Sequence, residues 1–377
     1  MLKFFALLAL TVALPVQAEI TSCYAQRNLV ANNPVFQPQL LDPLVRNAWG
    51  ISIRPAGLGG HFWIANTETG TSSTYVGDTE TTPLYQDDLK FVTVVGSQLP
   101  STPTGQTFSG SATDFMVTGE GITGPSRFLW ATEDGTISGW AERVNEDGSI
   151  ARMTSSVVVQ DRSQQGAIYK GLTASTFARG NRLYAANFGQ GQIEVYNEAF
   201  RPVPRNWTER GFERPFLRPA DIPGGYAPFN VQYLKGRVFV TYAKTTADPN
   251  TEEQGPGLGY VAIFDWYGNH IRTLDHSPKL NAPWGLVIAP ADFGPLSGAL
   301  LVGNFGDGTI VAFNQATGEQ LGYLLDTTGA PLKIDGLWGL IFGNGESLGR
   351  ADYLYFTAGP NGEEDGLFGS LNLVPCL

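Results

Sequence analysis

A short phrase that recurs six times along the chain constrains the fold more than any other feature of the sequence. In each copy a small, aromatic or glycine step leads into a short apolar strand, as it does over Asn47–Ile51 and Ala282–Leu286. Repeats of this length indicate copies of one supersecondary unit that cannot bury its apolar faces alone. The anchor residues are separated by 64, 57, 59, 55 and 54 positions, and they are Gly50, Asp114, Gly171, Asn230, Gly285 and Gly339.

Each phrase is followed by a second apolar strand, a tight turn and a third strand. Phe128–Thr132 and Gly135–Trp140 are one such pair, and the Asp-Gly step between them supplies the positive φ of a hairpin turn. The fourth copy carries a polar insertion, Lys244–Gly259, of the kind that forms a surface loop on one face of a repeat array. Capped segments of helical period are missing, and the repeats are long for an open β-solenoid, the alternative architecture. We therefore predict an all-β fold, a single six-bladed β-propeller over residues 19–377.

The N-terminal segment has the order of features typical of a secretory signal. Lys3 precedes an apolar run over Phe4–Leu14, and small residues flank the expected cleavage point after Ala18. The run is too short to span a bilayer, although a buried N-terminal strand or helix is an alternative interpretation. The sequence thus predicts a secreted or periplasmic protein without a membrane anchor.

The two cysteines lie at opposite ends of the expected mature chain, at Cys23 and Cys376. Segment Tyr24–Val30 precedes the first anchor at the distance of an outer strand, so we expect it to complete the sixth blade beside Leu367–Leu373. This arrangement brings the termini together, and an exported protein folds in an oxidising compartment. A Cys23–Cys376 disulfide that closes the ring is the resulting prediction.

The charge balance excludes several classes of partner. The chain has 35 acidic and 24 basic residues, a formal net charge of −11 at pH 7, which argues against nucleic acid and anionic membranes as partners. With three histidines, a His-rich transition-metal site is not expected. The partner expected for an exported chain of this composition is an extracellular or periplasmic ligand or protein.

Polar residues near the innermost strands are the natural candidates for a site, because those strands line the central channel of a propeller. Asn and Asp side chains there are suited to Ca²⁺, which prefers oxygen ligands, or to a polar ligand such as a sugar. The candidates are Asn47, Asp114, Glu133, Lys170, Asn230, Asn281 and Asp335.

Other conspicuous residues favour structural roles. The amides that recur at one repeat position, Asn66, Asn187 and Asn304, are typical of Asx turns, and Trp49, Trp284 and Trp338 favour packing between blades. Glu363-Glu364-Asp365 is expected to be a solvated turn, with calcium binding as the alternative, and the three histidines are expected to be solvated loop residues. The chain contains no nucleophile elbow, phosphate-binding loop or His-Glu-x-x-His pair.

Six stretches of the chain together resemble a family of secreted, mostly bacterial, conserved hypothetical proteins that are similar to NHL-type six-bladed propellers. These stretches are Asn47–Gly50, Ala131–Trp140, Ala227–Gln232, Val302–Ile310, Asp335–Leu340 and Phe356–Asn361. The resemblance covers nearly all of the mature chain and implies the fold and export, but no established activity.

A looser likeness, in architecture alone, runs to calcium-dependent propeller lactonases of the gluconolactonase type. That likeness implies a channel calcium held by carboxylate and amide oxygens, for which the residues here are Glu133, Asn187, Asn230, Asn304 and Asp335. Two functional hypotheses result. The first is a binding or interaction module for a glycan, peptide or protein; the alternative is a calcium-dependent hydrolase or lyase that acts on a small polar ester or a sugar at the central channel.

Overall fold

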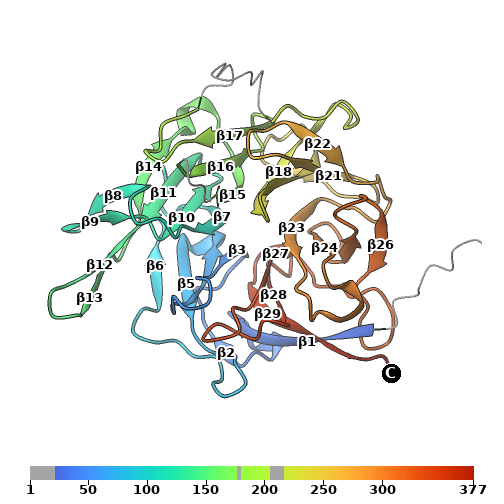
Figure 1. Ribbon diagram of the computed structural model, residues 1–377, viewed down its shortest axis with the longest axis horizontal. Coiled ribbons are helices and arrows are strands. Elements are labelled where there is room, and N and C mark those ends of the chain that lie inside the picture. Colours follow the sequence, from blue (N-terminus) through green and yellow to red (C-terminus); the bar gives the residue numbers. More distant parts are fainter. Residues whose placement is uncertain (1–21, 176–179, 204–215) are drawn as a thin grey trace, which may run out of the picture.

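Short strands joined by tight turns form six blades around a central axis (Figure 1). This computed structural model describes residues 22–175, 180–203 and 216–377, so the predicted signal peptide, Met1–Ala18, lies outside the described residues. In the described part of the chain, helical structure is limited to four 3₁₀ turns, at Pro34–Phe36, Thr67–Thr69, Ser163–Gln165 and Gly294–Leu296.

The strands of each blade follow one another outward from the axis, with β14 returning to the edge of the second blade. Neighbouring strands within a blade pair antiparallel, except that β2 pairs parallel with β1 at the outer edge of blade 6. Blade 1 contains β3 (Ala48–Ser52), β4 (Phe62–Asn66), β5 (Thr71–Tyr75) and β6 (Phe91–Thr93). Blade 2 contains β7 (Pro103–Phe108), β10 (Phe128–Thr132), β11 (Thr136–Trp140) and β14 (Val157–Asp161). Blade 3 contains β15 (Tyr169–Ser175), β16 (Arg182–Asn187) and β17 (Gln192–Tyr196).

The second half of the chain repeats this plan. Blade 4 contains β18 (Tyr226–Leu234), β19 (Arg237–Thr245), β21 (Gly259–Phe264) and β22 (His270–Thr273), and the short β20 (Glu252–Glu253) pairs with β19. Blade 5 contains β23 (Pro283–Ile288), β24 (Leu300–Asn304), β25 (Ile310–Phe313) and β26 (Gln320–Tyr323). Blade 6 contains β27 (Leu337–Phe342), β28 (Leu354–Ala358), β29 (Leu367–Pro375), β1 (Ser22–Ala31) and β2 (Leu40–Leu41).

The innermost strands contact one another in sequence, and the last, β27, contacts the first, β3, so the ring is closed. A glycine makes this close approach possible in five of the six inner strands, and the equivalent residue of β18 is Asn230. A Cβ added at Gly50 would collide with Thr104 of β7, and one added at Gly105 would collide with the backbone of β15. At Gly171, Gly285 and Gly339 an added Cβ would likewise collide with the next inner strand. The recurring glycine is therefore a packing requirement between blades.

The second blade does not begin where the sequence repeat predicted. Its inner strand is β7, and the residue equivalent to the other anchors is Gly105. The predicted anchor, Asp114, lies instead before β8 (Met116–Gly119), which pairs with β9 (Ile122–Pro125) in a hairpin that projects from the ring. A second hairpin, β12 (Glu142–Val144) with β13 (Ile150–Arg152), projects from the same blade. The apolar step Phe115–Val117 resembles the repeat because Phe115 and Val117 are buried in the hydrophobic core, as the residues of a blade strand are.

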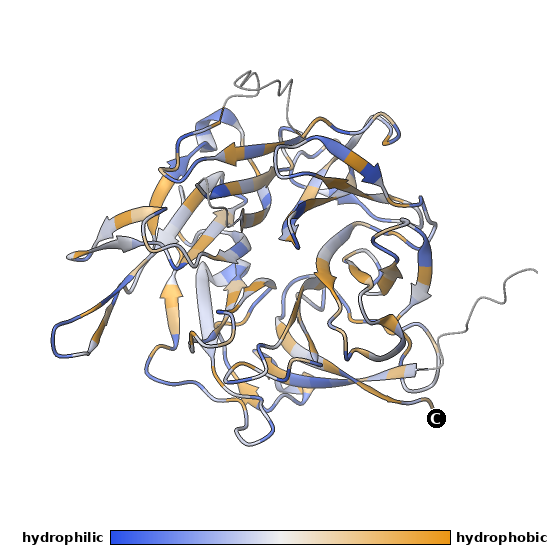
Figure 2. Cartoon of the chain, in the orientation of Figure 1, coloured by the Kyte–Doolittle hydropathy of each residue, from blue (hydrophilic) through white to orange (hydrophobic). Residues whose placement is uncertain are grey.

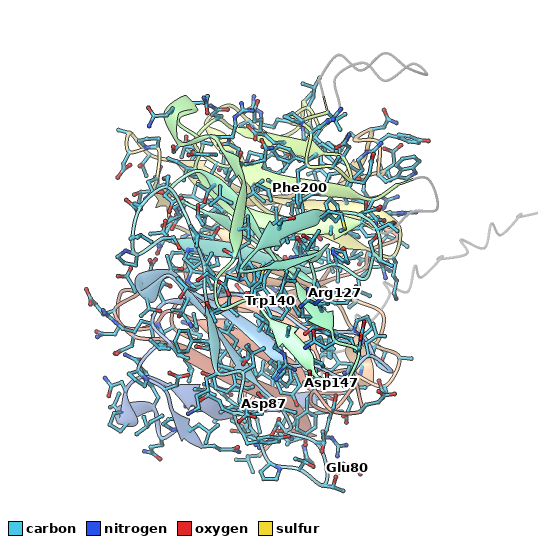
Figure 3. The ribbon with its side chains drawn as sticks, turned by 90° about the vertical axis from the view of Figure 1, so that its left-hand side faces the viewer. Glu80, Asp87, Arg127, Trp140, Asp147 and Phe200 are labelled. Atoms are coloured by element: carbon cyan, nitrogen blue, oxygen red, sulfur yellow. A yellow bond between two sulfur atoms is a disulfide. The ribbon has the colours of Figure 1, made fainter. Side chains whose placement is uncertain are left out.

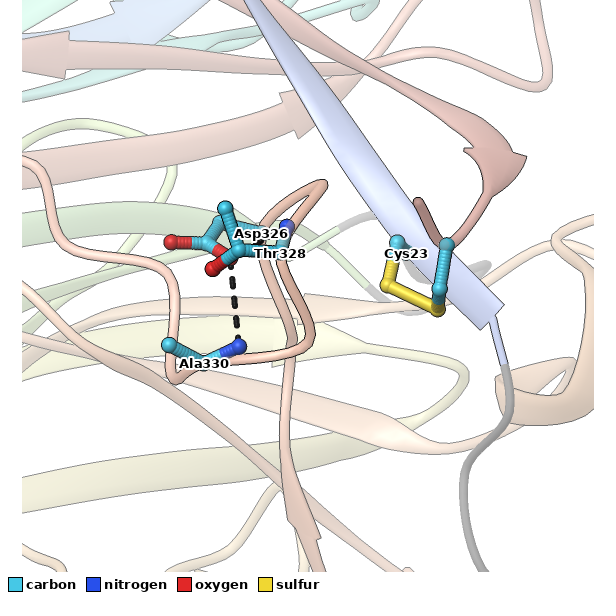
Figure 4. Close-up of a disulfide and its surroundings, with 5 residues drawn as sticks. Cys23, Asp326, Thr328 and Ala330 are labelled. Atoms are coloured by element: carbon cyan, nitrogen blue, oxygen red, sulfur yellow. Dashed lines mark hydrogen bonds between the residues drawn. A yellow bond between two sulfur atoms is a disulfide. The ribbon is translucent and has the colours of Figure 1, made fainter.

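The ring closes as the sequence predicted. Strand β1 pairs antiparallel with β29 over the whole length of β1, from Ser22 opposite Pro375 to Ala31 opposite Leu367. Cys23 and Cys376 form a disulfide beside this seam (Figure 4). The neighbouring turn, in which Asp326 accepts hydrogen bonds from the backbone N–H groups of Thr328 and Ala330, belongs to the connection between blades 5 and 6.

Hydrophobic residues lie along the strands throughout the ring, whereas the outer loops are largely hydrophilic (Figure 2). The buried side chains fill the spaces between blades. Trp63 of blade 1, for example, stacks on Phe128 of blade 2 with ring centroids 4.2 Å apart and packs against Trp140 at 4.9 Å. No helix among the described residues is long and apolar enough to cross a membrane.

Candidate functional site: the mouth of the central channel

The start of each inner strand and the end of the strand beside it share one face of the ring. Antiparallel pairing requires this, because Ala48 lies opposite Asn66 and Tyr169 opposite Asn187. The loops that follow β10, β19 and β28 therefore open on the same face as the residues that precede β3 and begin β15. We call this face of the channel the mouth.

Aromatic side chains fill the axis beneath the mouth. Trp338 stacks between Trp49 and Phe305, with ring centroids 3.7 and 3.8 Å apart, and Trp284 meets Trp338 edge-on at 5.9 Å. The three tryptophans are at most 3% exposed, which confirms their predicted packing role. The indole of Trp338 donates to Asn47 Oδ1 at 2.9 Å. The axis is therefore plugged, and these rings do not offer a stacking surface to a ligand.

A buried lysine lies directly on this aromatic plug. Lys170 begins the inner strand of blade 3 and is only 3% exposed, with its Nζ 5.1 Å from the ring centroid of Trp49. Its ammonium forms an ion pair with Glu133, which lies in the β10–β11 turn of blade 2 and whose side chain is 16% exposed. A buried charge of this kind requires such a partner, and the Trp49 ring adds a cation–π contact.

Two further glutamates approach the same place from other blades. Asn47 Nδ2 donates to Glu363 Oε2 at 2.9 Å, which holds the β28–β29 loop of blade 6 against blade 1. Burial raises the pKa of Glu363 to about 7, and the negative charges of Glu252 and Glu133 add to the rise while Lys170 opposes it. Burial is also the main cause of a raised pKa at Glu252. Lys170 opposes this rise, and Glu133 adds to it.

Five residues from five blades thus form one electrostatically coupled group, which we call the mouth cluster: Asn47, Glu133, Lys170, Glu252 and Glu363. Its single ammonium is already paired with Glu133. Burial is the main cause of the raised pKa values of the other two glutamates. The cluster also holds three carboxylates against one ammonium, so its negative charge is only partly offset.

The structure distributes the seven candidate residues between this cluster and other places. Asn47, Glu133 and Lys170 come together in the mouth cluster. Asn230 is fully buried and donates to the carbonyl of Trp284 in the next blade, at 2.8 Å. Asn281 accepts from the backbone N–H of Gly255 at 2.7 Å and so fastens the fourth-repeat insertion to blade 5.

The remaining two candidates lie apart from the cluster. Asp335 is exposed and accepts from the backbone N–H of Asn361 at 2.9 Å. Asp114 accepts from the backbone N–H of Asn181 at the start of β16, which is the end of the blade opposite the mouth. Its predicted position on the channel was wrong because the inner strand of blade 2 is β7.

Glu252 and Glu363 were missing from the predicted site. Glu252 lies in the polar insertion, where β20 folds back on β19 through the pairs Lys244–Glu253 and Thr245–Glu252. Glu363 belongs to the acidic triplet that was expected to be a solvated turn. Only its middle member, Glu364, is largely exposed, at 73% of its side chain, because Asp365 is buried and accepts from Asn32. The insertion itself was the signal that could have led to Glu252.

The residues proposed for calcium do not converge on one point. Asn187 is committed to its own turn, where Oδ1 accepts from the backbone N–H of Gln190 at 3.1 Å, and Asn304 Oδ1 accepts from that of Asn281 at 3.0 Å. Asn230 and Asp335 have the partners described above. Within residues 22–175, 180–203 and 216–377, no three His, Cys, Asp or Glu side chains are grouped closely enough to hold a metal ion. The set implied by the lactonase likeness therefore does not fit a calcium site.

Comparison with known proteins places the chain in a family without assigning an activity. No family model matches it. The chain is 31% identical over 352 residues to the uncharacterized protein R648 of Acanthamoeba polyphaga mimivirus, an alignment that covers 91% of this chain and 79% of the viral protein. A second uncharacterized protein of that virus, L690, is 29% identical over 351 residues, covering 91% and 84% of the two chains. The protein belongs to the family of these uncharacterized mimivirus proteins.

Among solved structures, the fold is similar to that of an α-L-arabinofuranosidase from Fusarium graminearum. Two structures of that enzyme, one with arabinobiose and one of a mutant with an iminosugar inhibitor, give TM-scores of 0.50 and 0.51. Each is 11% identical in sequence and covers 92% of this chain and 97% of the enzyme. At this identity the likeness shows the fold alone.

Proposed function

We propose that the protein is an exported interaction module whose mouth cluster binds a basic side chain of a peptide. The observation that carries this proposal is the surplus of carboxylates around one paired lysine. An ammonium or guanidinium group placed beside Glu252 and Glu363 would stabilise the ionised forms that burial disfavours and would offset the charge of the neighbouring carboxylates. The net charge of −11 supports association with a basic partner.

The proposal has a thermodynamic signature. A cation favours the ionised forms of Glu252 and Glu363, so its binding releases protons from the protein. Because the pKa of Glu363 is about 7, affinity for a lysine side chain is expected to rise with pH through that value. A ligand recognised by hydrogen bonds to protonated carboxyl groups would show the opposite dependence.

The test is calorimetric titration of the disulfide-bonded protein with a Gly-Lys-Gly peptide whose termini are blocked, beside the same peptide acetylated on its lysine. We expect the free lysine peptide to bind with proton release and Glu363→Gln to weaken it about tenfold, the loss of one hydrogen bond to a charged group. Glu364→Gln is the matched control, because Glu364 is exposed and pairs with Arg46. Equal binding of the two peptides, or unchanged affinity in Glu363→Gln, would refute the proposal.

The raised pKa of Glu363 supports a second candidate, hydrolysis of a small polar ester or glycoside. Glu363 keeps its proton up to about pH 7 and lies in one cluster with the Glu133 carboxylate, so an acid and a base are available together. Chromogenic aryl esters and glycosides are suitable probes. This candidate requires that the wild type turn over a probe and that Glu363→Gln abolish the turnover. An interaction module shows no turnover in the wild type or in Glu363→Gln.

A further inference from the structure

A cavity of about 310 Å³ lies at the end of the ring opposite the mouth, between blades 1, 2 and 6. Its walls are formed by the end of β3, the start of β4, the end of β11 and the start of β12, through Arg54, His61, Trp140 and Glu142. Figure 3 shows this side of the molecule, with Trp140 and Asp87 labelled. A second cavity of about 590 Å³ adjoins it, and the two share Leu89, Ile150 and Arg152.

We call the cavity of about 310 Å³ the inner cavity. Four residues that line it have a buried polar atom without a hydrogen-bond partner among the described residues. These atoms are Arg54 Nε, Trp63 Nε1, Arg152 Nε and Ser347 Oγ. Three of them can only donate, and Trp63 is just 1% exposed. Because an unsatisfied buried donor is costly, this concentration of donors around one cavity calls for a ligand that brings acceptors.

Two guanidinium groups lie at the cavity, those of Arg54 and Arg152. Glu142 lies between two guanidinium groups, with Oε1 2.6 Å from Arg54 Nη2 and Oε2 3.6 Å from Arg152 Nε. Asp87 lines the same cavity, so with His61 neutral the two guanidinium groups and the two carboxylates of the lining balance in charge. What favours a negatively charged acceptor is therefore the direct pairing that the guanidinium groups and the unpartnered N–H donors offer it, and not a net positive charge.

His61 adds a group that responds to such a ligand. Contrary to the expectation of a solvated loop residue, it is 7% exposed, and its Nε2 lies 2.8 Å from Asp87 Oδ2. Burial lowers the pKa of His61 below 6.5, Asp87 opposes the shift, and Arg152 and Arg54 add to it. The ring is therefore neutral at pH 7, and an anion that offsets the two arginines would favour its protonation.

We infer that the inner cavity binds the oxyanion of a small organic ligand, a carboxylate or a phosphate group. Arg54, Arg152 and Trp63 donate to its oxygens, and protonated His61 adds positive charge beside it. The adjoining cavity receives the rest of the ligand, and its lining includes Phe91 and Ile150, which are 44% and 45% exposed. This site is separate from the mouth cluster, so it stands or falls independently of the proposed function.

The experiment is calorimetric titration of the disulfide-bonded protein with hexanoate, inorganic phosphate and the uncharged control 1-hexanol, at about pH 5.5 and about pH 7.5. We expect an anion to bind, 1-hexanol not to bind, and affinity to be higher at the lower pH with proton uptake by the protein. Binding of hexanoate identifies a carboxylate, and binding of phosphate alone identifies a phosphate group. No binding of either anion, or equal binding of hexanoate and hexanol, would overturn the inference.

Two variants separate the roles of the lining residues. Arg54→Gln should weaken anion binding about tenfold, as expected for one charge-assisted hydrogen bond, whereas Arg143→Gln, an exposed arginine of the β12–β13 hairpin outside both cavities, should not. His61→Gln leaves the donors Arg54, Trp63 and Arg152 in place. It should therefore retain the affinity for the anion at the higher pH but lose the pH dependence of binding. A pH dependence that survives His61→Gln would overturn the role of His61. Thermal unfolding of each variant confirms that it is folded before it is titrated.

Discussion

Replacement of Glu363 by glutamine is expected to stabilise the protein at alkaline pH, although it alters a side chain with a hydrogen-bond partner. The introduced glutamine retains an oxygen that can accept from Asn47, so the contact between blades 1 and 6 survives. What the substitution removes is the cost of ionising a carboxyl group that is buried beside Glu252 and Glu133.

The magnitude follows from the pKa. In the folded protein the pKa of Glu363 rises from 4.5 to about 7, so the folded state binds this proton more tightly than the unfolded state does. The contribution of Glu363 to the free energy of unfolding therefore declines as pH rises between these two values and is constant above them. Across this pH interval, ionisation of Glu363 lowers the free energy of unfolding by about 3 kcal/mol. Glu363→Gln lacks this penalty, so its advantage over the wild type is absent below about pH 4.5 and complete above about pH 7.

Urea denaturation at a series of pH values measures this difference, because the variant and the wild type share every other titrating group. Glu364→Gln serves as the control, since Glu364 is exposed and its removal should leave the profile parallel to that of the wild type. A difference between Glu363→Gln and wild type that does not change with pH would refute the raised pKa. The proton release expected when a basic side chain binds at the mouth would then be absent as well.

Three further predictions concern the ring. Replacing both Cys23 and Cys376 by serine should lower the free energy of unfolding by about 4–6 kcal/mol, because the disulfide closes a loop with a sequence separation of 353 residues; a loss below about 1 kcal/mol in urea denaturation would contradict this. Gly105→Ala should cost at least about 3 kcal/mol through its collision with β15, while Gly124→Ala, whose nearest neighbours are 3.5 and 3.6 Å away, should change stability by less than about 0.5 kcal/mol. Asn230→Ala should cost about 2 kcal/mol by removing the bond to the next blade, and unchanged thermal stability would exclude that role.

The sequence repeat was sufficient to predict the six blades and their closure, because both depend on regular features. The inner strands must approach closely, so glycine recurs at Gly50, Gly171, Gly285 and Gly339, which are two, two and one repeats apart. The predicted position of the inner strand was wrong only in blade 2. Its true anchor, Gly105, lies within Pro103–Phe108, a stretch with few apolar residues whose buried Gln106 bonds to the Trp63 carbonyl at 2.8 Å. A search for apolar strands passes over such a segment and selects the hairpin that follows it.

The mouth cluster was only partly predictable for a different reason. Asn47, Glu133 and Lys170 lie at repeat positions, so their approach to the axis follows from the fold. Glu252 and Glu363 lie in loops whose paths are set by long-range contacts, among them the bond from the Gly255 N–H to Asn281. Periodicity contains no information about such contacts. An acidic residue in an irregular insertion looks solvated in the sequence even when tertiary structure buries it.

The mouth cluster lies across the junction between the first and last blades, so ring closure and the geometry of the candidate site depend on the same contacts. Asn47 begins blade 1 and Glu363 belongs to blade 6, so their hydrogen bond crosses the junction between the first and last blades. The indole of Trp338 crosses the same junction to Asn47, and the hydroxyl of Thr357 donates to the backbone carbonyl of Trp49. Loosening of the last blade would therefore separate Glu363 from the rest of the cluster. Pairing of β1 with β29 and the terminal disulfide oppose that motion, so they stabilise the carboxylate arrangement at the mouth as well as the fold.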